Sequence, residues 1–410
     1  MFVLLEIKSK YKNYFNSFRN LECFMKDNKI LYQTDTETKT IFDRTLNYLN
    51  SKYSIRFNTI SLEFEIKLLF DKKWTTLNLN SLFIELVRSG IDIPINKLEI
   101  LIRSHLIQQY NPIREYFENL EDWDQQDHIG KLCSYIRTTD NMSFQKYFEK
   151  WLTRTVICAL KPGYINKQCL VLFNIKQNTG KTSFLRFLIP LQLEKYYTED
   201  IGVDKDGLIA LCKNLLINID ELSVMSKTDV NILKSFISKN TVNARLPYDR
   251  KSTLMQRTAS FCGSTNRFDF LTDETGSVRW QVFEVLNIDF NYSKDINIEK
   301  VWSQAYYNAF ERKNYNPELT VEDIQENEKR NEKFKQISLE QEIILSHFEK
   351  SKLQNEFMTP SDIMLAMNNA LGVRLNIIKI GKALTAMNYE RIKHPKRQVY
   401  GYLIRRKIEE

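Results

Sequence analysis

The chain has 410 residues and a formal net charge of +8, and 43% of its residues are hydrophobic and 27% charged. This is the composition of a folded globular protein. With only 11 glycines and 8 prolines it excludes long flexible linkers, and the basic charge favours a polyanionic partner. No apolar run reaches the roughly 18 residues that cross a membrane, and the six cysteines are scattered without zinc-ligand spacing. We therefore expect a cytoplasmic protein with buried, reduced cysteines and no membrane partner.

Residues 1–110 are predicted to form an N-terminal α+β domain. Strand-like runs cover 29–35 and 53–71, and a helical period extends from Leu82 to Gln108. No primase or nuclease motif is visible in these residues, so a fused polymerising activity is not expected.

Residues 111–165 are predicted to form a helical lead-in to the next domain. Pro112 suits the first turn of a helix, and Ile113 and Phe117 follow it at helical spacing. A second amphipathic helix is expected at about 144–160.

Residues 166–335 are predicted to form an α/β domain with a mostly parallel sheet. Apolar segments typical of buried strands lie at 169–173, 215–219 and 258–264, and helical segments lie at about 181–188, 204–212 and 228–238. Such alternation is typical of a parallel sheet covered by helices. A helix near 298–312 comes next, and the charged stretch at 320–336 is predicted to be a solvated helix or a linker.

Residues 336–410 are predicted to form a winged helix. Helices are expected at 339–350, 360–370 and 376–387, and a strand at 399–406. Ten Lys or Arg stand against one acid between residues 374 and 407, which favours DNA as the partner, while protein contacts remain the alternative. The predicted DNA contacts are Lys379 and Lys382 on the third helix and Lys396 and Arg397 on the wing.

A nucleotide-binding loop is predicted where "CLVLFNIKQNTGKTSF" passes from a strand to a helix. The usual pattern is G-x-x-x-x-G-K-[ST], and Ile175 stands where its first glycine belongs. The residues predicted to bind nucleotide are Gln177, Asn178, Thr179, Gly180, Lys181, Thr182 and Ser183. A match as short as Gly-Lys-Thr also occurs by chance. It is good evidence for a nucleotide site only if catalytic residues follow the next strands of the chain.

Carboxylates stand directly after the next apolar strand, whose end we expect beside the loop. Asp220 suits a Mg²⁺ site together with Thr182, and Glu221 suits the base that polarises an attacking water. A solvated acidic pair at a strand end is the alternative.

Polar residues also stand after the third apolar strand. Asn266 is placed to contact a γ-phosphate or the attacking water, and Arg267 or Arg279 to stabilise charge on the phosphoryl group of a neighbouring subunit. Each arginine alone is equally explained as a surface residue.

The order of these motifs resembles that of superfamily 3 helicases of the AAA+ class, and more closely the virulence-associated protein E (VapE-like) family of phages and mobile genetic elements. The resemblance covers about 110–334 and is carried by "YNPIREYFENLEDWD", "IDEL" and "GSTNRFDFLTDETGSVRW". It implies an AAA+ P-loop ATPase that uses ATP and Mg²⁺ and assembles into a ring of six subunits, with the lead-in helices as a collar.

The loop departs from that family, whose pattern is G-x-Q-G-x-G-K-[ST]. Ile175 and Asn178 replace two glycines. Asparagine tolerates positive φ, whereas a β-branched residue does not. We predict a working loop, with weaker nucleotide affinity and an inactive scaffold as the open alternatives.

The resemblance also implies a hairpin that grips single-stranded DNA, within "NTVNARLPYDRKSTLMQR". Its basic residues are Arg245, Arg250, Lys251 and Arg257, and the first three are the predicted contacts. A hairpin without a ligand, or arginines that face the next subunit's nucleotide, are the alternatives.

The sequence therefore predicts an ATP-dependent ring helicase that unwinds single-stranded and forked DNA to replicate a phage or mobile element. Its expected partners are DNA, copies of itself, and a replication initiator or primase. The main rival is an origin-binding initiator that uses ATP only as a switch.

Overall fold

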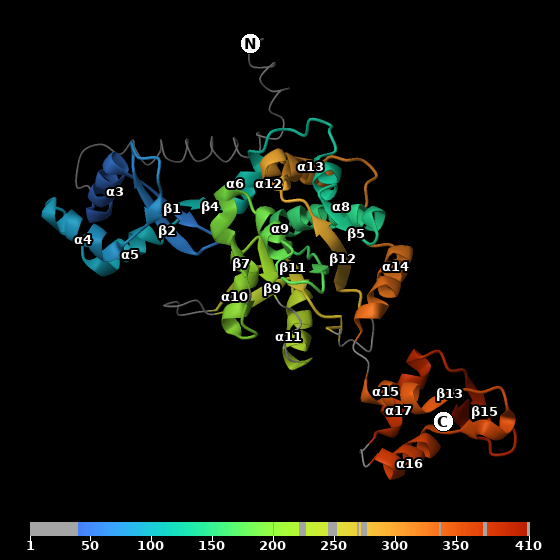
Figure 1. Cartoon of the computed structure of the whole chain (residues 1–410). Helices are drawn as coiled ribbons and strands as arrows, with labels where there is room; N and C mark the ends of the chain where they lie inside the picture. The colour runs from blue at the N-terminus through green and yellow to red at the C-terminus, as the bar shows by residue number, and fades with distance from the viewer. Residues whose placement is uncertain are drawn as a thin grey trace. The chain divides into compact units, whose positions relative to one another are not determined.

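The computed structural model describes residues 40–199, 201–220, 227–244, 252–268, 270–271, 277–335, 338–371 and 375–407. Residue contacts divide the chain into two units, 1–110 and 111–410, and both contain helices and strands (Figure 1). The chain is therefore a mixed α/β protein, as its sequence predicts. Among the described helices, none is long and apolar enough to cross a membrane.

A four-stranded sheet and three helices form the described part of the first unit. The strands are β1 (Tyr53–Asn58), β2 (Glu63–Leu68), β3 (Thr75–Thr76) and β4 (Gln108–Tyr110), and the helices are α3 (Ile41–Lys52), α4 (Leu79–Arg88) and α5 (Ile95–Ile102). The strand order is β3-β2-β1-β4, with β1 antiparallel to β2 and parallel to β4. Leu49, Leu86 and Leu98, one from each helix, are buried in the core that covers the apolar side of this sheet.

The single helical period predicted from Leu82 to Gln108 is wrong, because the structure has α4, α5 and β4 there. Gly90 adopts φ +78° and Pro94 occupies the N-cap position of α5. The chain turns between the two helices, since a proline ring removes a helical hydrogen bond and clashes with the preceding turn. The predicted strand region at 53–71 does form β1 and β2, whereas the run predicted at 29–35 lies outside the described residues.

A six-stranded sheet lies at the centre of the second unit. Its strands are β5 (Ile136–Thr138), β6 (Cys169–Phe173), β7 (Tyr197–Glu199), β8 (Leu216–Ile219), β11 (Ser260–Thr265) and β12 (Trp280–Ile288). Their order is β5-β12-β6-β11-β8-β7, and every pair is parallel except β5 with β12. All residues of β6, β8 and β11 are buried, which is why these segments are strongly apolar in the sequence. The three predicted strands are confirmed.

Helices surround this sheet. They are α6 (Pro112–Glu118), α7 (His128–Cys133), α8 (Asn141–Leu160), α9 (Lys181–Phe187), α10 (Lys205–Lys213), α11 (Lys227–Ile237), α12 (Tyr292–Asp295), α13 (Ile298–Phe310) and α14 (Val321–Asn331), with 3₁₀ turns at Leu191–Tyr196 and Glu332–Phe334. Trp151 Nε1 of α8 donates to the carbonyl oxygen of Phe261 in β11 at 3.1 Å, and Trp302 Nε1 of α13 donates to that of Leu188 at 2.8 Å. These bonds fix two long helices to the elements that carry the candidate site.

The charged stretch predicted to be a solvated helix or a linker forms α14, but one side of this helix is buried. The side-chain amides of Asn327 and Asn331 donate to the carbonyl oxygen of Trp280 at 2.9 and 2.7 Å. Arg330 Nε donates to the carbonyl oxygen of Val282 at 3.0 Å. The predicted helix is therefore present with one exposed side, and its other side satisfies backbone groups of β12 before the point where that strand pairs with β5.

The last 70 or so residues form a small sheet with three helices. The elements are α15 (Leu339–His347), β13 (Phe348–Lys350), a 3₁₀ turn (Gln354–Glu356), β14 (Phe357–Met358), α16 (Pro360–Leu371), α17 (Ile377–Ala386), β15 (Arg391–Lys393) and β16 (Tyr400–Arg406). β16 pairs antiparallel with β13, β14 and β15. The three predicted helices and the final strand are therefore found near their predicted positions.

The described cysteines are buried, as predicted. They are Cys133, Cys158, Cys169, Cys212 and Cys262. Burial raises the pKa of these thiols, to about 12 for Cys212, because the thiolate is poorly solvated inside the protein. They therefore act as small apolar residues at neutral pH, while Cys23 lies outside the described residues.

Candidate functional site

The candidate site is the loop that joins β6 to α9, residues 174–180. Asn174 anchors its start: Nδ2 donates to the carbonyl oxygen of Val285 in β12 at 2.6 Å, and Oδ1 accepts the Lys176 amide at 2.7 Å. Gly180 ends the loop in the left-handed region at φ +85°, and α9 begins at the next residue. The loop is thus held at both ends, at the carboxyl edge of the sheet where open α/β folds bind ligands.

The two residues that replace glycines in this loop differ in backbone conformation. Asn178 adopts φ +57°, the left-handed region in which asparagine is tolerated. Ile175 is not among the residues with positive φ, and 64% of its surface is exposed. The expected conflict between a β-branched residue and the loop backbone is therefore wrong.

Lys181 is the buried cation of the loop, with 6% of its surface exposed. Its ammonium group donates to four neutral oxygens: Asn266 Oδ1 (2.7 Å), Thr179 Oγ1 (3.1 Å), Lys176 O (3.3 Å) and Asn174 O (3.4 Å). Burial lowers the pKa of Lys181, and the charge of Asp220 partly opposes this shift. A buried positive charge held by neutral oxygens is a group that a bound anion would stabilise.

Asp220 comes directly after β8 and faces the start of α9. Its Oδ1 accepts the hydroxyl of Thr182 at 3.1 Å and that of Ser264 in β11. Asp220 thus lies beside the loop, as predicted, although β11 separates β8 from β6, the strand of the loop. Ser264, which was not predicted, bridges that separation, and its only signal in the sequence was a hydroxyl near the end of a buried strand.

This oxygen cluster fits a magnesium ion. A carboxylate and two hydroxyls are hard oxygen donors, the type that Mg²⁺ prefers. Among the described residues, no group of three His, Cys, Asp or Glu side chains could hold a metal by itself. An ion at Thr182 and Asp220 would therefore also need oxygens from a bound phosphate and from water.

Asn266 and Arg267 come directly after β11, at the same edge of the sheet as the loop. The contact of Asn266 with Lys181 shows that the structure brings these two predicted residues together. The side chain of Arg267 is exposed, and its backbone amide donates to Thr265 Oγ1 at 3.3 Å.

Arg279 lies at the opposite edge. Its carbonyl oxygen accepts the amide of Cys169, the first residue of β6, at 2.7 Å, whereas the loop begins after the last residue of β6. A strand of this length spans about 16 Å, so Arg279 does not reach the loop of its own chain. Its Nε donates to Ser238 Oγ at 3.1 Å.

The remaining predicted loop residues differ in exposure. Gln177, Asn178 and Ser183 are exposed, and Thr179 and Thr182 are partly buried. Glu221, the predicted base, lies outside the described residues.

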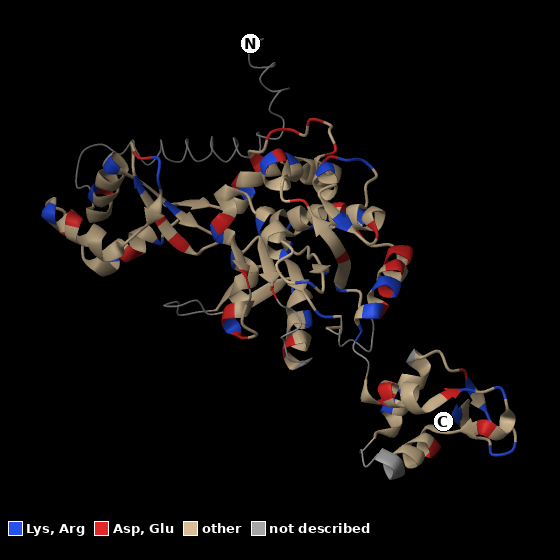
Figure 2. Cartoon of the chain, in the orientation of Figure 1, with Lys and Arg blue, Asp and Glu red and all other residues tan. Residues whose placement is uncertain are grey.

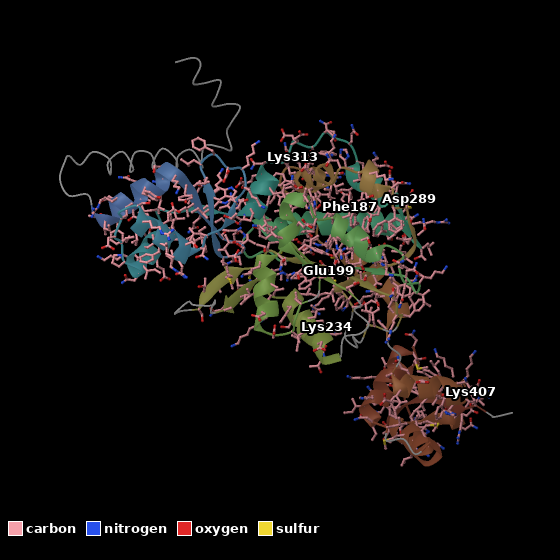
Figure 3. All side chains as sticks on the ribbon, turned by 60° about the vertical axis from the view of Figure 1, so that its left-hand side comes forward. Phe187, Glu199, Lys234, Asp289, Lys313 and Lys407 are labelled. Atoms are coloured by element: carbon pink, nitrogen blue, oxygen red, sulfur yellow. The ribbon has the colours of Figure 1, made fainter. Side chains whose placement is uncertain are left out.

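The segment after β12 packs against α9, on the other side of the loop from Asp220. The buried ring of Tyr292 meets the rings of Phe184 and Phe187 edge-on, with centroids 5.4 and 4.9 Å apart. Figure 3 labels Phe187 and Asp289 on these two neighbouring segments. Helix α9 is therefore braced by the residues that come after β12.

The predicted hairpin is present as β9 (Thr241–Ala244) and β10 (Thr253–Gln256), which pair antiparallel. Its predicted DNA contacts, Arg245, Arg250 and Lys251, lie outside the described residues. The expectation that Arg257 belongs to this basic surface is wrong, because it is 2% exposed. Its guanidinium donates to the backbone carbonyl oxygens of Phe236, Ile237, Lys239, Asn166 and Ala259. Arg257 therefore ties the base of the hairpin to the end of α11.

The four predicted DNA contacts near the C-terminus are all exposed. Figure 2 marks lysine and arginine positions in blue along the ribbon of this part of the chain. Lys379 and Lys382 lie on α17, and Lys396 and Arg397 lie in the turn between β15 and β16. His394 Nδ1 accepts the amides of Lys396 and Arg397 at 3.2 and 3.1 Å, which shapes this turn.

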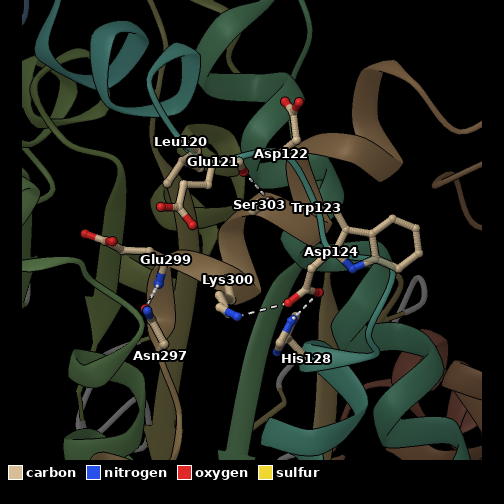
Figure 4. Close-up of a pocket in the computed structure, with 10 residues that line it drawn as sticks. All are labelled: Leu120, Glu121, Asp122, Trp123, Asp124, His128, Asn297, Glu299, Lys300 and Ser303. Carbon is tan, nitrogen blue, oxygen red and sulfur yellow. Dashed lines mark hydrogen bonds and ion pairs between the residues drawn. The ribbon is translucent and has the colours of Figure 1, made fainter.

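A separate pocket, not predicted from the sequence, is shown in Figure 4. Its lining residues are Leu120, Glu121, Asp122, Trp123, Asp124, His128, Asn297, Glu299, Lys300 and Ser303. Asp124 contacts Lys300 at 3.0 Å and His128 at 2.7 Å, and these partners lower the pKa of its carboxyl group. Because four carboxylates line this pocket against one lysine, it is unsuited to a phosphate.

The fold and the site together define an α/β protein with a candidate phosphate site at the carboxyl edge of its sheet. The family model of the virulence-associated protein E-like domain matches residues 117–336. This match covers more than half of the chain, which therefore belongs to the virulence-associated protein E-like family.

Two solved structures of the NrS-1 C-terminal region, both in the apo state, have a similar fold. One is 14% identical over 90% of this chain and all of its own, with a TM-score of 0.50. The other, the A form, is 13% identical over 89% of this chain and all of its own, with a TM-score of 0.51. At this identity the likeness concerns the fold alone. A search of curated protein sequences found no match.

Proposed function

We propose that this protein is an ATP-hydrolysing AAA+ motor of the superfamily 3 type that unwinds DNA in the replication of a phage or mobile element. The observation that carries the proposal is Lys181, a buried ammonium group whose hydrogen-bond acceptors are all neutral. A triphosphate would supply the missing negative charge. Gly180 in the left-handed region and the adjacent hydroxyl of Thr182 complete the arrangement expected of a phosphate-binding loop.

Each residue of the site has a role in this proposal. Lys181 binds the β- and γ-phosphates by exchanging its neutral acceptors for phosphate oxygens. Asn266, which contacts that lysine at 2.7 Å, senses the γ-phosphate. Thr182 and Asp220 hold Mg²⁺, which when bound neutralises charge on the phosphate oxygens. Glu221 orients the attacking water.

The position of Arg279 supports its action on a neighbouring subunit. It lies at the opposite edge of the sheet from the loop of its own chain, so the nucleotide it could contact belongs to another copy. Arg267 lies at the same edge as its own loop and is the weaker candidate for that role. An arginine supplied between copies requires an assembly, and the family resemblance leads us to propose a ring of six.

DNA binding rests on the basic residues of the hairpin and of the C-terminal winged helix. Exposed Lys379, Lys382, Lys396 and Arg397 offer phosphate contacts that do not depend on sequence. The same basic residues also support the second candidate function, an initiator that binds duplex origin DNA and uses ATP only as a switch.

Strand displacement on forked DNA distinguishes these two functions. Wild type with ATP and Mg²⁺ should separate the strands, and Lys181→Ala should not. Lys205→Ala, which removes an exposed lysine from α10, is the matched control and should behave as wild type. Tight, sequence-specific duplex binding without strand separation would instead favour the initiator.

A further inference from the structure

The arrangement of the strands orients a nucleotide in the proposed site. Asp220 and Asn266 come after β8 and β11, which lie on one side of β6, whereas β12 lies on the other side. If the terminal phosphate faces Asp220 and Asn266, as the proposed function requires, the nucleoside points toward the end of β12. Any contact between the nucleoside and the residues after β12 therefore rests on the proposed function.

An exposed aromatic residue lies at that end of the site. Phe290 comes two residues after β12, and 55% of its surface is exposed. Its ring packs on Gly180: a Cβ atom added to this glycine would lie 2.6 Å from Cζ and 2.7 Å from Cε1 of Phe290. The ring therefore touches the last residue of the loop and still offers open surface to a ligand.

The backbone around Phe290 is fixed on both sides. The Asp289 amide donates to the carbonyl oxygen of Tyr135 at 2.8 Å, and Asp289 Oδ1 accepts the Asn291 amide at 3.0 Å. Tyr292 is buried against the aromatic side chains of α9. An exposed phenylalanine on a braced segment is a preorganised surface, because little conformational entropy is lost when a ligand packs on it.

We propose that Phe290 stacks on the base of the bound nucleotide. Base–aromatic stacking uses the π face that every base offers, so Phe290 favours a nucleotide over a bare triphosphate without choosing among purines. This would give the site a base-binding element beside its phosphate-binding residues.

Calorimetric titration of the full chain with Mg²⁺-ATP and with Mg²⁺-tripolyphosphate tests this inference. Phe290→Ala should weaken ATP binding by about tenfold, within a range of roughly 5- to 150-fold, and leave tripolyphosphate binding unchanged. Phe290→Trp should keep ATP affinity and show indole fluorescence that ATP quenches and tripolyphosphate does not. Phe310→Ala, which removes a phenylalanine of similar exposure (47%) at the end of α13, should change neither affinity.

Three results would overturn the inference. Equal loss of ATP and tripolyphosphate affinity in Phe290→Ala would mean that the ring shapes the loop. Equal affinity of wild type for both ligands would exclude base stacking and leave the proposed phosphate site standing. Failure of wild type to bind either ligand would refute the proposed function, and this inference with it.

Discussion

Replacing Lys181 with methionine is expected to raise the melting temperature of the protein without nucleotide. With nucleotide bound to wild type, the variant should melt below wild type. Without nucleotide, the variant loses a buried charge whose acceptors are all neutral. Replacing a buried ion pair with apolar residues of similar volume is often neutral or stabilising by about 1–4 kcal/mol, because the cost of desolvating the charges is removed. The four oxygens that Lys181 would release belong to residues that are exposed or partly exposed, so water can replace its hydrogen bonds. We therefore expect a gain of about 1 kcal/mol, which is about 2–4 °C in melting temperature for a domain of this size.

With nucleotide present, wild type is expected to become more stable than Lys181→Met. ATP at 100 times its Kd stabilises a protein that binds it by about 2.7 kcal/mol, and Lys181→Met should not gain this. Thermal unfolding is measured with and without Mg²⁺-ATP, and the transition that ATP shifts in wild type is the one compared. Lys205→Met, at an exposed position, is the control and should match wild type in both conditions.

The difference in stability between Lys181→Met and wild type without nucleotide should also depend on pH. Burial lowers the pKa of Lys181 below its value of 10.5 in the unfolded chain. The penalty for burying the charge is therefore complete below the lowered pKa and declines as the pH rises from there to 10.5. The advantage of Lys181→Met without nucleotide should shrink over that range. A variant that melts below wild type without nucleotide, or that ATP stabilises equally, would refute this reasoning.

Three further results are expected. Ile175→Gly should change the Kd for ATP by less than about twofold in calorimetry, since this backbone does not need positive φ, and about tenfold tighter binding would contradict that. Arg257→Met should lower the melting temperature by about 10 °C, because buried carbonyl oxygens lose a charged donor, while exposed Arg137→Met should change it little. Mixing Arg279→Ala with Glu221→Gln subunits should restore some ATP turnover, and no recovery would count against action between subunits.

The sequence predicted best the buried strands, because each of them is a continuous run of apolar residues. The strands at 169–173, 215–219 and 258–264 are continuous apolar runs because parallel strands inside a sheet are covered on both faces. Their carboxyl ends share one edge, which is why Lys181 and Asn266 could be expected to meet.

Features that depend on contacts distant in sequence were not predicted. The sequence does not encode strand order locally, so the position of β11 between β6 and β8, and with it Ser264, was unexpected. Phe290 was not predicted because its contact with Gly180 joins segments far apart in the chain. Arg257 was expected on the exposed basic surface of the hairpin but is buried. The sequence around an arginine does not show whether it lies at the exposed tip of a hairpin or is buried at its base.

Steady-state phosphate release by wild type, with and without single-stranded DNA and beside Lys181→Ala, tests the central claim most directly. We predict turnover that DNA stimulates, that rising salt reduces, and that the variant lacks. Wild-type turnover no higher than that of Lys181→Ala in both conditions would contradict the motor and leave a DNA-binding scaffold as the better account.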